Sequence, residues 1–208
     1  MVGDVRGLRL LDVACGQGLA SRALAEAGAA EVCGVDTSAE MLELARGHGG
    51  PANLRYVWDD AQTLRTFPDE TFDGVNCQLG LMDIPNLAGT VEATYRVLRP
   101  GGWFAFVIGH PCFLAPDAET ATNREGRIGR WVGEYFDERF WRSRNPQGVR
   151  RAGNHHRPLS TYLNHLLATG FVIDRAAEPR PSPRLKSEHP EYDLVPMFWA
   201  MRSHRPGA

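Results

Sequence analysis

The sequence has no excess of positive charge and no long hydrophobic run. Its 208 residues carry 23 basic and 25 acidic side chains, for a formal net charge of −2. Such a chain has no global positive field to draw it onto nucleic acid or anionic lipid. No apolar run approaches the roughly 20 residues of a membrane span. Because Asp4 also interrupts the amino terminus where a signal peptide becomes apolar, we expect a cytoplasmic protein without nucleic-acid or membrane partners.

Lysine and closely spaced cysteines are also scarce. Lys186 is the only lysine, and the bias toward arginine, alanine and glycine is typical of a GC-rich genome rather than of phosphate recognition. The cysteines stand far apart, and none forms a C-x-x-C pair. This pattern favours free thiols in a reducing compartment and predicts no metal site. The four cysteines are Cys15, Cys33, Cys77 and Cys112.

What the sequence does contain, from Leu8 to Ile108, is an alternation of short apolar runs with helical patterns. This alternation predicts β-α units on a parallel sheet within a single domain spanning residues 1–208. The expected strands are Leu8–Val13, Glu31–Val35, Leu54–Trp58, Gly74–Gln78 and Trp103–Ile108. The first expected helix is Leu19–Ala27. A Thr37/Glu40 capping box begins the second, which ends at Gly47. The third is Leu87–Leu98, with Asn86 as its cap.

The segment from Pro111 to Arg157 has no clean periodicity and is too long for a passive connection. We therefore expect it to be a lid or substrate-recognition insertion. A turn over residues 99–102 precedes the fifth strand. Beyond the insertion we expect a Ser160-capped helix to Ala168, a strand Phe171–Arg175, a proline-rich loop through Asp193, and a last strand Leu194–Met201.

A glycine-rich turn follows the first expected strand and opens a helix, so its backbone can approach a ligand closely. Asp36 follows Gly16 by 20 residues, just past the second strand, where a carboxylate can accept both hydroxyls of an adenosine ribose. Asp12 precedes the loop and suits a ligand with a cationic amino-acid end rather than a pyrophosphate. At the third strand end, Asp60 and the Ala61 N–H can pair with the edge of an adenine. These residues indicate one adenosyl ligand.

Five segments carry a resemblance to a known family: LDVACGQG, GVDTSAEMLELAR, WDDAQTL, FDGVNCQLGLMDIP and RVLRPGGWFAF. Over Leu10 to His110 the chain resembles the class I S-adenosylmethionine-dependent methyltransferases, in the small-molecule group of the ubiquinone and menaquinone biosynthesis enzymes. The resemblance implies a Rossmann-like, doubly wound, mostly parallel seven-stranded sheet of order 3-2-1-4-5-7-6, with S-adenosylmethionine as cofactor and S-adenosylhomocysteine as product. The cofactor-binding residues we expect on this basis are Asp12, Ala14, Gly16, Gly18, Asp36, Thr37, Met41, Asp60, Ala61 and Gln78.

Candidate acceptor residues lie after the fourth strand and in the insertion. Asp83 is expected to line the pocket or to act in catalysis, and Met41 to contact adenine or to fill the core. Five aromatic residues stand between Trp131 and Trp141, either closing over a flat acceptor or forming a small satellite core. We expect Trp131, Tyr135 and Tyr162 to contact the acceptor. An excess of arginine from Arg124 to Arg157 would recognise a substrate carboxylate or only solvate the lid.

Two histidines flanking the insertion are candidate general bases, because a neutral imidazole can take a proton from the acceptor at pH 7. They are His110, directly after the fifth strand, and His156. Methyl transfer from a sulfonium needs little beyond in-line alignment, so a base is optional. His156 and Arg157 would alternatively fix the lid to the helix that follows.

The favoured function is methyl transfer to O, N or C of a small organic acceptor, as in specialised metabolism. The alternatives are an S-adenosylmethionine-binding regulatory protein without catalysis, and a nicotinamide oxidoreductase, which Asp12 and Asp60 disfavour. Nucleic-acid methylation is weaker still, because GLMDIP stands where an N/D-P-P-Y-like tetrapeptide is expected. Only Met1 to Gly7 precede the first strand, so we expect an open pocket covered by the lid together with a second subunit of a homodimer, or a chain start that lies further upstream.

Overall fold

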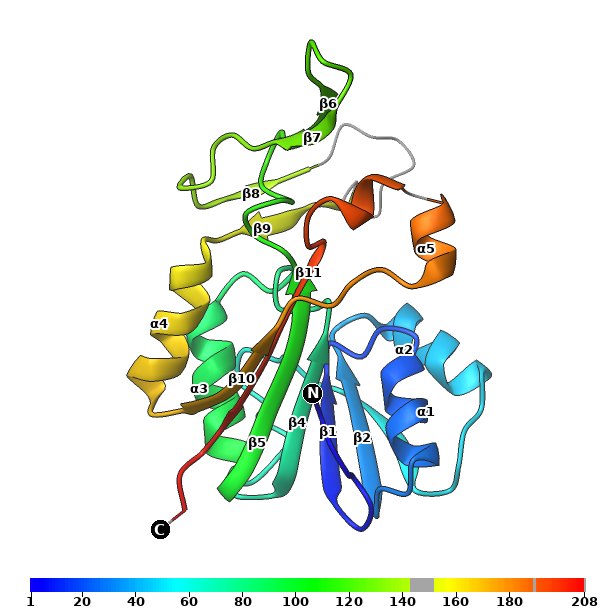
Figure 1. The fold of residues 1–208 in the computed structure, drawn as a ribbon. Coiled ribbons are helices and arrows are strands. Elements are labelled where there is room, and N and C mark those ends of the chain that lie inside the picture. The colour runs from blue at the N-terminus through cyan, green and yellow to red at the C-terminus, as the bar shows by residue number, and fades with distance from the viewer. Residues whose placement is uncertain (143–151, 189, 208) are drawn as a thin grey trace.

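The computed structural model describes residues 1–142, 152–188 and 190–207, with a seven-stranded sheet at the centre. The strand order is β10-β11-β5-β4-β1-β2-β3, which confirms the predicted order 3-2-1-4-5-7-6 (Figure 1). β11 runs antiparallel to both of its neighbours, and the pairs from β3 to β5 are parallel. The strands are β1 (Arg9–Val13), β2 (Glu31–Asp36), β3 (Leu54–Trp58), β4 (Phe72–Gln78), β5 (Leu98–Gly109), β10 (Val172–Ala177) and β11 (Phe198–His204).

Helices cover both faces of this sheet. On one face α1 packs Leu24 and Ala25 against Leu10 and Val32 of the neighbouring strands. On the other face, residues of α3 and α4 join a larger core with the side chains that alternate along β1, β4 and β5. The sheet is therefore buried on both sides, as a parallel sheet requires. The helices are α1 (Leu19–Glu26), α2 (Ala39–Gly47), α3 (Leu87–Val97), α4 (Leu159–Thr169) and α5 (Pro183–Glu188).

The helix caps correct two of the sequence predictions. α2 is capped by Ser38, whose Oγ accepts from the Met41 N–H at 3.2 Å, rather than by Thr37. α4 begins after Pro158 and has no Ser160 cap, because the fixed φ of proline already suits a helix start. Asn86 caps α3 as predicted, its Oδ1 accepting from the Gly89 N–H at 3.0 Å.

The carboxyl-terminal third differs most from prediction. The proline-rich stretch contains α5, because Ser182 caps the Leu185 N–H and Pro183 takes the first helical position. β11 starts at Phe198 instead of Leu194, since Pro196 has no N–H to donate to a neighbouring strand. The turn predicted at residues 99–102 lies within β5, at a register shift opposite β4.

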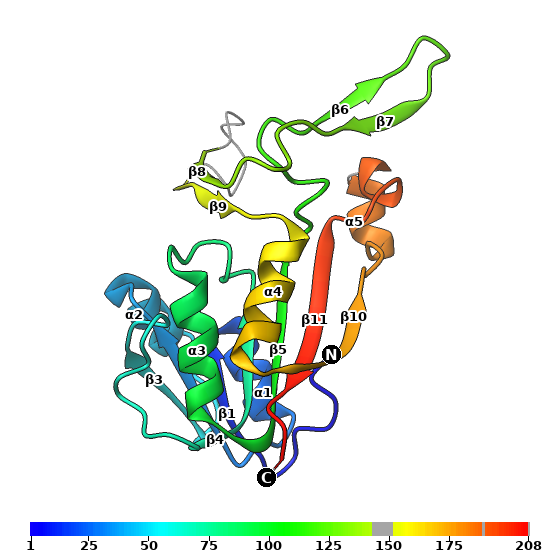
Figure 2. The same ribbon diagram turned by 90° about the vertical axis from the view of Figure 1, so that its left-hand side faces the viewer.

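The insertion after β5 contains regular structure where we predicted none. β6 (Glu119–Thr122) pairs with β7 (Ile128–Trp131), and β8 (Arg139–Trp141) pairs with β9 (Asn154–His156). Both two-stranded sheets stand beyond the carboxyl ends of the parallel strands (Figures 1 and 2). This placement is where open α/β folds bind their ligands. The arginines at 144, 150 and 151 lie outside the described residues.

Candidate functional site

The loop that follows β1 is folded so that part of its backbone is open. Ala14, Gly16 and Gly18 have positive φ angles of 53°, 53° and 76°. A Cβ at Gly18 would lie 2.1 Å from the Oη of Tyr56, whereas one at Gly16 would have no neighbour within 4 Å. Packing and φ therefore both require glycine at position 18, and the backbone at Gly16 is accessible to a ligand. The N-terminus of α1 has no side-chain cap among the described residues, so its N–H groups can donate to a ligand.

Asp36, at the end of β2, joins this loop to the next strand. Its Oδ2 accepts from the Gly16 N–H at 2.8 Å, and its Oδ1 accepts from the Ser38 N–H at 2.9 Å. Each carboxylate oxygen retains a second lone pair. Asp36 thus fixes the position of the loop and can still accept hydrogen bonds from two vicinal hydroxyls.

Asp12 lies behind the loop and is 1% exposed. Its Oδ2 accepts from the Ser21 Oγ at 2.5 Å and its Oδ1 from the Asn76 Nδ2 at 2.7 Å. Burial raises the pKa of the Asp12 carboxyl to about 6, although both of these hydrogen bonds lower it. The Asp12 side chain therefore lies behind the loop and supports it. A ligand amine on the open side of the loop would be attracted by the Asp12 charge through the intervening backbone.

This buried carboxyl makes stability depend on pH. The folded-state pKa of about 6 lies above the usual 3.8, so between these values the folded protein binds more protons than the unfolded chain. Lowering the pH from 7 to 4 should therefore stabilise the natural protein relative to Asp12→Asn, by on the order of 3 kcal/mol. Urea unfolding of both proteins at several pH values measures this difference. Parallel pH curves for the two proteins would contradict the role of Asp12.

Apolar side chains are exposed on α2 and at the end of β3. Met41 is 41% exposed, so the alternative that it fills the core is wrong; Leu42 and Ala45 are the buried residues of α2. Trp58, which the sequence reading missed, is 61% exposed and donates its Nε1–H to the Thr37 carbonyl oxygen at 2.8 Å. Exposed apolar surface beside a ribose-type carboxylate fits a stacked base. The available sequence signal was a tryptophan two residues before the Asp60-Ala61 pair.

Two acidic side chains within the turn after β3 stabilise that turn by accepting hydrogen bonds. Asp59 is 5% exposed and accepts from the N–H groups of Asp60 and Thr66, at 2.7 and 2.9 Å. The Asp60 carboxylate accepts from the main-chain and side-chain N–H groups of Gln62. Ala61 is nearly buried, and Gln78 is exposed at the end of β4. Asp60 and Gln78 therefore lie at the same edge of the sheet as Asp36.

His110 is buried directly after β5 and pairs with a carboxylate that the sequence did not indicate. Its Nδ1 accepts from the Cys112 N–H at 3.3 Å, so the neutral ring carries its proton on Nε2. That Nε2–H donates to Glu178 Oε1 at 3.0 Å, and the Glu178 side chain is 57% exposed. With both ring nitrogens engaged, Glu178 rather than His110 presents an accessible acceptor.

His156 is the last residue of β9, near the carboxyl end of the insertion. It is 4% exposed, and its Nε2–H donates to the Tyr135 carbonyl oxygen at 2.8 Å. Burial lowers the pKa of its imidazole. The Tyr135 Oη in turn accepts from the Leu159 N–H at 3.0 Å. These contacts join the insertion to the start of α4, which is the alternative to a catalytic role for His156.

Of the predicted acceptor residues, Tyr162 lines a small cavity together with Met82 and His156. Tyr162 is 3% exposed and packs between Phe106 and Trp199, with ring centroids 6.3 Å from each. Asp83 is exposed after β4, and Trp131 is 55% exposed on β7. Three of the five insertion aromatics are thus largely exposed, which argues against a satellite core: Trp131 at 55%, Phe136 at 87% and Phe140 at 49%.

Arg157 fixes the loop after β4 from the carboxyl end of the insertion. Arg157 is 7% exposed, and its guanidinium donates to the carbonyl oxygens of Leu81, Ile84 and Pro85, at 3.2, 2.7 and 2.7 Å. The loop that contains Asp83 is therefore held in shape by Arg157, which follows it in the sequence only after the whole insertion.

The comparisons agree with this geometry. A methyltransferase domain family matches residues 11–106. The ubiquinone biosynthesis O-methyltransferase of Bordetella avium is 35% identical over 108 residues, which are 51% of this chain and 44% of that protein. The Neisseria meningitidis enzyme of the same name is 34% identical over 106 residues. The matched stretch spans less than half the length of these curated relatives.

Two solved structures match nearly the whole chain. An S-adenosylmethionine-dependent methyltransferase from Mesorhizobium loti is 31% identical with a TM-score of 0.84, covering 97% of this chain and 93% of that one. A Listeria monocytogenes structure of the same proposed class is 28% identical, with a TM-score of 0.82 and coverage of 99% and 94%. The seven-stranded fold and the glycine-rich loop after β1 together define a Rossmann-like protein that binds an adenosyl group. The chain belongs to the S-adenosylmethionine-dependent methyltransferases, whose cofactor is S-adenosylmethionine.

Proposed function

We propose that this protein transfers the methyl group of S-adenosylmethionine to an oxygen, nitrogen or carbon atom of a small organic acceptor. The observation that carries the proposal is the open loop at Gly16, tied through its N–H to Asp36 at 2.8 Å. A backbone that a ligand can reach, next to a carboxylate with unused lone pairs, suits the amino-acid and ribose parts of one adenosyl ligand.

In this proposal the cofactor spans the carboxyl edge of the sheet from β1 to β3. Asp36 accepts from the ribose hydroxyls, and Met41 and Trp58 lie against the adenine. Asp60 and the Ala61 N–H pair with the edge of that base. The remaining contacts come from the loop and the adjoining strand ends: Asp12, Ala14, Gly16, Gly18, Thr37 and Gln78.

The insertion is proposed to cover the acceptor. It stands over the carboxyl edge of the sheet (Figure 2). Its exposed rings supply rigid apolar contact area. A small acceptor also fits the net charge of −2, which offers no surface for tracking nucleic acid. No helix in the described residues is long and apolar enough to cross a membrane. A second subunit that covers the exposed rings stays a prediction, which light scattering tests.

Calorimetry and a transfer assay test the function together. S-adenosylhomocysteine should bind with micromolar affinity and NADH should not, because Asp12 is poorly placed for a pyrophosphate. With labelled S-adenosylmethionine, extracts of small molecules should acquire label only when the protein is present. Binding of NADH without binding of S-adenosylhomocysteine would refute the proposal. Tight S-adenosylhomocysteine binding with no labelled product from any extract would favour a binding protein without catalysis.

A further inference from the structure

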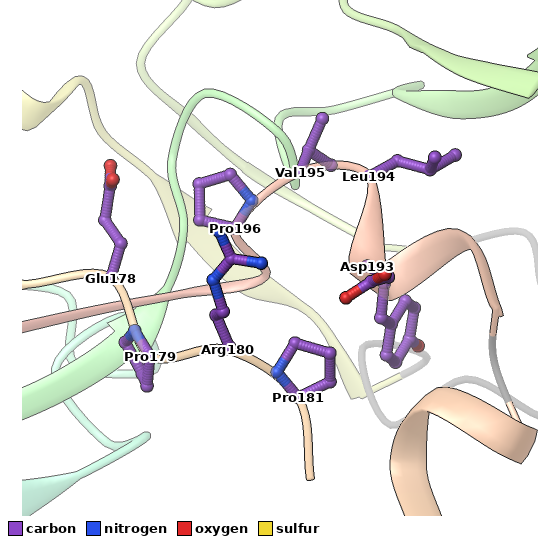
Figure 3. A pocket seen from close by; sticks show the side chains of 9 residues that line it. Glu178, Pro179, Arg180, Pro181, Asp193, Leu194, Val195 and Pro196 are labelled. Atoms are coloured by element: carbon purple, nitrogen blue, oxygen red, sulfur yellow. The ribbon is translucent and has the colours of Figure 1, made fainter. Parts of the chain in front are cut away.

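A cavity of about 210 Å³ lies between the loop that leaves β10 and the loop that enters β11. Its floor is the sequence Glu178-Pro179-Arg180-Pro181, which alternates charged residues with prolines. Proline fixes its own φ and keeps the residue before it extended, so this stretch is stiff. Figure 3 shows the Glu178 and Arg180 side chains rising in the same direction, with Arg180 between the rings of Pro196 and Pro181. The cavity is thus preformed.

Among the charged side chains that line this cavity, Arg180 is exposed and differs from the two carboxylates in its hydrogen bonding. Glu178 accepts from His110 Nε2 at 3.0 Å, and Asp193 pairs with the Lys186 Nζ at 2.5 Å. Arg180 makes no hydrogen bond or ion pair with any residue that the structure describes. Both carboxylates therefore have a donor, while the guanidinium between them has no acceptor. An anionic ligand would complete the set.

The cavity lies within reach of the proposed transfer site. The His110 N–H, directly after β5, donates to the Met197 carbonyl oxygen at 2.8 Å, so the cavity wall is joined to the carboxyl edge of the sheet. β10, which Arg180 follows, is separated from β4 by β11 and β5, so these two strands lie about 14 Å apart. The Arg180 side chain and a single substituted ring together can span this distance. A ligand held here can present its other end to the carboxyl end of β4, beside the cofactor that is proposed to begin at β1.

We propose that this cavity holds the carboxylate group of the methyl acceptor, with Arg180 as its bidentate partner. The planar guanidinium matches a carboxylate in shape and can donate two parallel hydrogen bonds to it. Pro179, Pro196 and Leu194 provide apolar walls for the hydrocarbon part. The acceptor class is therefore a small aromatic or aliphatic carboxylic acid. This inference rests on the proposed methyltransferase function for its use of the bound ligand.

Ligand-observed NMR with benzoate and its neutral isostere benzamide tests the site. Benzoate should bind the full-length protein saturated with S-adenosylhomocysteine, and benzamide should bind about tenfold more weakly. Arg180→Gln should weaken benzoate binding about tenfold and abolish the preference over benzamide. Arg184→Gln is the matched control, because Arg184 is 87% exposed and pairs with Glu188 on α5. Thermal melting should be unchanged in both variants, since neither side chain is packed in the core.

The outcomes separate this inference from the proposed function. Equal binding of benzoate and benzamide, or benzoate binding that survives Arg180→Gln, would overturn the carboxylate site. Either result leaves the methyltransferase function intact if S-adenosylhomocysteine still binds. Conversely, benzoate binding that depends on Arg180, in a protein that fails to bind S-adenosylhomocysteine, would support the site and refute the cofactor assignment.

Discussion

Replacing Arg157 with leucine is expected to lower the free energy of unfolding by about 3 kcal/mol. Arg157 is 7% exposed, and its guanidinium donates to the carbonyl oxygens of Leu81, Ile84 and Pro85. Leucine removes all of these donors at once and leaves the carbonyl groups unsatisfied where water enters poorly. Urea denaturation followed by circular dichroism measures the loss.

Arg157→Lys provides the graded comparison. An ammonium reaches fewer of the three carbonyl groups than the guanidinium fork does, so its effect should fall between those of arginine and leucine. The loop that carries Asp83 should also become more susceptible to proteolysis in the leucine variant. A leucine variant as stable as the natural protein would show that this loop holds its shape without Arg157.

Replacing Asp36 with alanine is expected to weaken S-adenosylhomocysteine binding by about 10- to 100-fold. The change removes the acceptor for two ribose hydroxyls and also the bond that Asp36 makes to the Gly16 N–H at 2.8 Å. The loop then loses its tie to β2, which adds to the direct loss. Titration calorimetry measures the affinity, and the fold should survive because Asp36 is only partly buried.

Asp69→Ala is the control for removal of a negative charge. Asp69 is 72% exposed and pairs with Arg96 at the opposite edge of the sheet, so its loss should leave affinity unchanged. Asp36→Asn keeps one acceptor oxygen and should give an intermediate affinity. Unchanged affinity in Asp36→Ala would exclude Asp36 from the cofactor site.

The parallel half of the fold could be predicted because its signals are local. β3 has the predicted bounds, and Asn86 caps α3 as expected, since apolar runs and capping residues act within a few positions of themselves. The carboxyl-terminal third was harder to predict from the sequence. There, Pro196 and the Ser182-Pro183 pair set the starts of β11 and α5 through a missing donor and a helix cap, at positions where the apolar pattern alone was uninformative.

By itself the sequence determined the class of sheet, the glycine loop and the acid that follows it, because strand periodicity, positive φ at glycine and the spacing to Asp36 are encoded locally. Only the tertiary structure decided which groups meet across the chain. Glu178 reaches His110 over 68 residues, and Arg157 reaches Leu81 over 76. These pairs arise from the antiparallel return of β11 and from the path of the insertion. Their partners are therefore fixed by strand pairing and packing, which leave no short-range trace in the sequence.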